Sequence, residues 1–65
     1  MNEFDQIAKK LWFGDRATIK LLDGMTDRDR MHIEQRLLSL YGVNVNLFGT
    51  IEEMGAALEG ARNPL

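Results

Sequence analysis

The 65-residue chain is long enough for one domain, and a domain of this size buries only about 60% of the surface that its unfolded chain exposes. The chain has no cysteine, which excludes disulfides and thiolate metal sites, so its stability must come from packed helices or from a partner. The formal net charge of −2 argues against a protein that binds nucleic acid by neutralising phosphates. Because no apolar run reaches the roughly 20 residues of a membrane span and the start of the chain is acidic rather than basic, we expect a cytoplasmic protein without membrane contact.

The first predicted helix spans about residues 3–13. Asn2 can cap it, because an Asn side chain can accept a hydrogen bond from a free N–H group of the first turn. Apolar residues at helical spacing form one face, made of Phe4, Ile7, Ala8, Leu11 and Trp12. Gly14 is expected to end the helix. Phe13 lies off this face, and we expect it to cover the end of the bundle, with an exposed anchor for a partner as the alternative.

Residues 15–24 carry two conflicting signals. Asp15 can cap a short helix, but Ala17, Ile19 and Leu21 alternate with polar residues, as in a strand. A lone strand has no partner in this chain, so we favour a loop with room for one helical turn. The pair Asp23-Gly24 is typical of a turn.

The central helix is predicted over residues 27–41. Thr26 can cap it, and Asp29, three residues later, completes a pattern similar to a capping box. The expected inner stripe, flanked by Met31 and Leu38, consists of Ile33, Leu37, Leu40 and Tyr41. Gly42 ends the helix in a backbone conformation that residues with a Cβ atom resist.

After Gly42 the sequence predicts an extended connector and a last helix over about residues 50–60, with residues 61–65 as a tail. The connector alternates apolar and Asn residues, and we expect Val43, Val45 and Leu47 to point inward. Thr50 and Glu53 form a capping box for the last helix, whose apolar face comprises Ile51, Met54, Leu58 and Ala61. The chain is therefore predicted to be one all-α domain, a small three- to four-helix bundle.

The sequence offers no set of catalytic residues. Its one histidine, His32, and one serine, Ser39, lie seven residues apart on the central helix, which separates them by about 10 Å where a nucleophile and its base need about 3 Å. There is no Gly-rich phosphate loop and no metal-ligand spacing. We therefore expect neither enzyme activity nor a cofactor or metal. The run Asp27-Arg28-Asp29-Arg30 fits a solvated helix start or a recognition patch, and both interpretations stay open.

From Leu21 to Leu58 the chain resembles the acyl and peptidyl carrier proteins. Leu21-Leu22-Asp23-Gly24 is similar to the turn before their second helix, Tyr41-Gly42-Val43-Asn44-Val45 to its end, and Thr50-Ile51-Glu52-Glu53-Met54 to the start of their last helix. The resemblance implies a four-helix bundle whose second helix begins with an Asp-Ser-Leu motif, where the serine carries phosphopantetheine. Here Thr26-Asp27-Arg28 occupies that motif. Asp27 stands at the attachment position, and a carboxylate cannot accept the phosphodiester.

The resemblance also implies that partners recognise the second helix, where the matching positions are Arg28, Asp29, His32, Gln35 and Arg36. We therefore expect a non-catalytic protein-interaction module, a docking, scaffold or inhibitor protein, that acts as a monomer or weak dimer. A biosynthetic enzyme is one candidate partner. Two alternatives stay open. One is a working carrier protein of a fatty-acid, polyketide or nonribosomal-peptide pathway with an unorthodox attachment site. The other is a small helical regulator that binds nucleic acid or a transcription protein.

Overall fold

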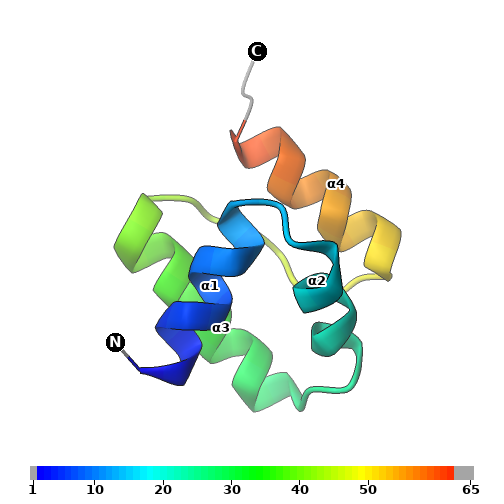
Figure 1. Ribbon diagram of the computed structural model, residues 1–65, viewed down its shortest axis with the longest axis horizontal. Coiled ribbons are helices and arrows are strands. Elements are labelled where there is room, and N and C mark those ends of the chain that lie inside the picture. Colours follow the sequence, from blue (N-terminus) through cyan, green and yellow to red (C-terminus); the bar gives the residue numbers. More distant parts are fainter. Residues whose placement is uncertain (1, 63–65) are drawn as a thin grey trace.

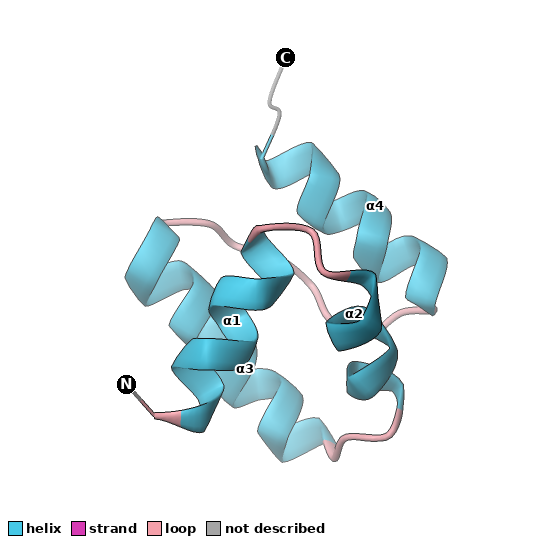
Figure 2. Cartoon of the chain, in the orientation of Figure 1, coloured by secondary structure: helices cyan, strands magenta, loops and turns pink. Residues whose placement is uncertain are grey.

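Four α-helices and no strand make up the part of the chain that the computed structural model describes, residues 2–62 (Figures 1 and 2). The helices are α1 (Glu3–Trp12), α2 (Arg16–Asp23), α3 (Asp27–Tyr41) and α4 (Ile51–Arg62). The prediction of a small all-α bundle is confirmed. None of these helices is long and apolar enough to cross a membrane.

Helix α1 begins where the sequence predicts and ends at Trp12. The Oδ1 atom of Asn2 accepts a hydrogen bond from the backbone N–H of Asp5 at 2.8 Å, which is the expected cap. The side chain of Phe13 is 70% exposed, so the expectation that it covers the end of the bundle is wrong. That end is instead held by Trp12, whose ring stacks on Tyr41 of α3 with the centroids 5.1 Å apart.

Residues 16–23 form a helix, so the preference for a loop there is wrong. The Oδ1 atom of Asp15 accepts hydrogen bonds from the backbone N–H groups of Ala17 and Thr18, at 3.0 and 3.3 Å. The helix buries Thr18, Ile19 and Leu22, residues at helical spacing. The apparent strand alternation depended on Leu21, which is 58% exposed. The cap and the burial of one helical face therefore outweigh the alternating pattern.

Helix α3 has the predicted bounds and caps. The Oγ1 atom of Thr26 accepts from the N–H of Asp29 at 3.2 Å, and Gly42, at φ +68°, donates its N–H to the carbonyl of Leu38. Ile33 and Leu37 are fully buried, whereas Leu40 is 40% exposed. The inner stripe of α3 is therefore narrower than predicted, and Leu40 belongs to its edge.

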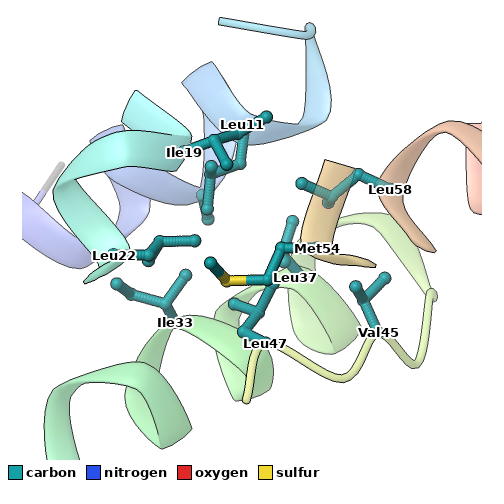
Figure 3. Packing of buried hydrophobic residues seen from close by; sticks show 10 residues of the cluster. Leu11, Ile19, Leu22, Ile33, Leu37, Val45, Leu47, Met54 and Leu58 are labelled. Carbon is teal, nitrogen blue, oxygen red and sulfur yellow. The ribbon is translucent and has the colours of Figure 1, made fainter. Parts of the chain in front are cut away.

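The core lies between the four helices and the connector (Figure 3). Val45 and Leu47 are buried, as predicted, and the N–H of Leu47 donates to Oε2 of Glu34 on α3 at 2.7 Å. From α4, Met54 and Leu58 enter the core, and Figure 3 shows the Met54 side chain pointing toward residues of α2 and α3.

Helix α4 begins with the predicted capping box and continues beyond its predicted end. Thr50 and Glu53 exchange two hydrogen bonds, each 3.1 Å long, between side chain and backbone N–H. The hydrogen bond that the Glu53 carboxylate accepts from the backbone N–H of Thr50 lowers the pKa of Glu53 below its ordinary value of 4.5, and the side chain of Thr50 lowers it further. Ala61 and Arg62, expected in a tail, are helical. The rest of that predicted tail, residues 63–65, lies outside the described residues.

Arg62 ties the end of α4 to the end of α1. Its Nη1 atom donates to the carbonyl oxygen of Trp12 at 3.2 Å, where a helix end favours a cation. The guanidinium passes directly over Gly14, where an added Cβ atom would lie 2.6 Å from Nη1. Gly14 also has φ +86°. The left-handed backbone conformation therefore favours glycine at this position, and an added Cβ would also force the flexible end of the Arg62 side chain to move.

Candidate partner-binding surface

A shallow depression lies on the side of α3 that faces away from the core. Four residues line it, Arg28, Met31, His32 and Gln35. They are spaced i, i+3, i+4 and i+7, which places them on one side of the helix. Leu38 continues the same side one turn further on. We call these five residues the outer face of α3.

Two apolar side chains dominate this outer face. Met31 and Leu38 are each 52% exposed. The sequence pattern predicts both beside the inner stripe of α3, so their position on the surface differs from the prediction. The signal was present, since each lies three residues after a polar residue of the proposed partner-binding set, Arg28 and Gln35.

The structure brings together three of the five sequence-predicted partner residues. Arg28, His32 and Gln35 are exposed and line the depression. Arg36 instead forms an ion pair with Asp5 of α1, and both side chains are partly buried. Asp29 is half-buried in the first turn, where its N–H bonds the Thr26 cap. Asp29 and Arg36 are therefore not part of the outer face.

The charged side chains in the middle of α3 are used within the fold. The carboxylate of Glu34 holds the connector through Leu47, and Arg36 pairs with Asp5. Arg30 donates to the carbonyl of Asp23 at 3.3 Å and lies 5.9 Å from the ring centre of Phe48. Beyond Arg28 the outer face consequently carries no carboxylate and no Lys or Arg. Burying this part of the outer face against a partner therefore requires little desolvation of charge.

His32 is held at the edge of the outer face by an aromatic contact. Its ring stacks on Phe4 of α1, with the centroids 5.2 Å apart and the planes 17° from parallel. Ser39 is exposed further along α3. Within residues 2–62, no group of three or more His, Asp and Glu side chains could hold a metal ion.

Asp27 is the exposed first residue of α3, directly before the outer face. A carboxylate at this position is favoured by the N-terminal end of the helix dipole. The carboxylate of Asp27 is thus accounted for by helix stability.

No protein-family model, curated protein or solved structure matches this chain. The structure therefore supports the carrier-protein resemblance only at the level of a four-helix bundle.

Proposed function

We propose that this protein is a non-catalytic interaction module that docks another protein onto the outer face of α3. The observation that supports the proposal is the exposed pair Met31 and Leu38, set among polar groups on a helix side free of carboxylates. Completing the burial of two half-exposed side chains of this size would contribute roughly 1 kcal/mol each to binding.

The carrier-protein resemblance supplies the class of partner. The resemblance aligns α3 with the helix that partners recognise in carrier proteins, and Gly42 ends α3 in the same aromatic-Gly-aliphatic pattern. A cytoplasmic biosynthetic enzyme, scaffolded or inhibited by this chain, is the partner that the resemblance implies.

A docking role without chemistry agrees with the surroundings of the polar side chains. His32 is stacked on Phe4, and Asp27, at the attachment position, offers no hydroxyl group for a phosphodiester. Incubation with coenzyme A and a promiscuous phosphopantetheinyl transferase tests this point by mass spectrometry. We expect an unchanged mass, and an added phosphopantetheine group would make the protein a carrier.

Docking itself is tested by affinity capture from native lysate with the full chain immobilised. Leu38→Glu and Arg28→Glu should each lose the captured partner. Leu21→Glu is the matched control, because Leu21 on α2 is similarly exposed but lies on a different helix. A partner retained by both α3 variants, or lost equally with Leu21→Glu, would contradict docking through α3.

A further inference from the structure

The outer face of α3 has the residue spacing of a coiled-coil seam. Arg28, Met31, Gln35 and Leu38 follow one another at intervals of three, four and three residues. This is the alternation of the a and d positions that lets two helices wind around each other. The four residues extend over about 15 Å of helix, and all four are exposed.

The residues that line the depression on α3 have the spacing of the hole into which a side chain packs in a coiled coil. In such packing, each side chain of one helix inserts between four residues of the facing helix, at i, i+3, i+4 and i+7. Arg28, Met31, His32 and Gln35, which line the depression, have this spacing. Helix α3 therefore presents both a row of projecting side chains and a preformed hole between them.

The position of Arg28 favours a second copy as the facing helix, in antiparallel orientation. The last turns of α1, α2 and α4 contain basic residues, but the last turn of α3 contains none. Its C-terminal carbonyl groups, with their partial negative charge, thus have no cation nearby in sequence. Arg28 lies at the opposite end of the same seam, so an antiparallel copy would bring its Arg28 to this uncompensated end.

The four seam residues of one copy are complementary to those of a second copy in this antiparallel arrangement. When a and d positions face each other across a two-fold axis, Arg28 of one copy packs beside Leu38 of the second copy, and Met31 packs beside Gln35. The hydrocarbon stem of Arg28 covers Leu38, while its guanidinium reaches the carbonyl groups at the helix end. Gln35 of each copy enters the hole that contains Arg28 and His32, where it finds polar groups.

We propose that the outer face of α3 binds a second copy of this chain, forming an antiparallel two-helix interface. The inference rests on the proposed function, since it identifies a partner for the same surface. The seam has only four layers, whereas stable coiled coils extend over three to four heptads. The dimer is therefore weak and in exchange with the monomer, which leaves the face accessible to another protein.

The oligomeric state is measured on the full chain by sedimentation velocity between about 10 µM and about 1 mM, a range suited to weak association. We expect a shift from monomer to dimer within it. Leu38→Glu should raise the dissociation constant at least about tenfold, because both copies lose a buried leucine, while Leu21→Glu leaves it unchanged. Gln35→Leu should instead tighten the dimer, because a polar residue at a seam position costs stability.

Cysteine cross-linking tests the orientation, and the absence of native cysteine makes it specific. When Met31→Cys and Gln35→Cys proteins are mixed and oxidised, an antiparallel seam yields mainly the mixed disulfide. A parallel seam yields the two homodimers, which would overturn the proposed orientation.

Three outcomes would overturn the second copy as occupant, and they differ in what they imply for docking. A protein that stays monomeric while Leu38→Glu still loses a captured partner refutes only the self-pairing. A dimer unaffected by Leu38→Glu places the contact between copies elsewhere. A monomer whose Leu38→Glu variant captures the same proteins as the wild type refutes both the self-pairing and docking through α3.

Discussion

Replacing Gly14 with alanine should destabilise the protein through two separable effects. The residue has φ +86°, and a left-handed backbone conformation costs a residue with a Cβ atom about 1–2 kcal/mol. The added Cβ would also lie 2.6 Å from Nη1 of Arg62, so the guanidinium must move, and we expect its bond to the Trp12 carbonyl to be lost. Such a hydrogen bond contributes about 0.5–1.5 kcal/mol.

The combined loss is about 1.5–3.5 kcal/mol, a large share of the roughly 3–10 kcal/mol expected for a domain of this length. We expect the midpoint of thermal unfolding to fall by roughly 10–20 °C. Urea unfolding can be followed by the fluorescence of Trp12, the one tryptophan of the chain, and by helical circular dichroism.

A double-mutant cycle with Arg62→Ala separates the two effects. In the Arg62→Ala background, Gly14→Ala should cost only the backbone term, so the two substitutions together should destabilise less than their individual effects predict, by about 1 kcal/mol. Strict additivity would show that Arg62 and Gly14 do not interact, and an unchanged free energy of unfolding for Gly14→Ala would refute the reasoning altogether.

Three further predictions concern the core, the ion pair and the capping box. Leu37→Ala, which removes a fully buried side chain, should cost about 2–5 kcal/mol and leave a partly unfolded protein by circular dichroism; a cost below 1 kcal/mol would contradict the packing. Arg36→Ala should lower the free energy of unfolding by up to about 1 kcal/mol, because its ion pair with Asp5 is lost, and should leave partner capture and dimerisation unchanged. Lost binding without lost stability would show that Arg36 belongs to the partner-binding surface. Because the folded state lowers the pKa of Glu53, its carboxylate stabilises the fold above pH 4.5, and this contribution is lost as the pH falls through the lowered pKa. Glu53→Gln should therefore remove that part of the pH dependence of urea unfolding, and an identical pH profile for both proteins would argue against the cap.

Residue identity at helix ends was enough to predict most of the local structure. Asn2, Thr26 and Thr50 each accept the expected hydrogen bond, and Gly42 adopts the expected left-handed conformation. These interactions join residues at most four positions apart, so the sequence contains all the information they need. The exception is α2, where the Asp15 cap predicts a helix but the alternation of Ala17, Ile19 and Leu21 predicts an extended segment. The burial of Ile19 and Leu22 decides for the helix.

Only the tertiary structure decided which side of each helix is covered. Met31, Leu38 and Leu40 have the same apolar character as Ile33 and Leu37, and the neighbouring helices and connector determine which of them are buried. In the same way, the pairing of Arg36 with Asp5 joins residues 31 positions apart, which no local pattern specifies. The sequence therefore determined the caps at Asn2, Thr26 and Thr50 and the end of α3 at Gly42, because those interactions are local. The tertiary structure decided which residues form the outer face of α3. Packing buries the opposite side of that helix, and Glu34 and Arg36 interact with the connector and α1.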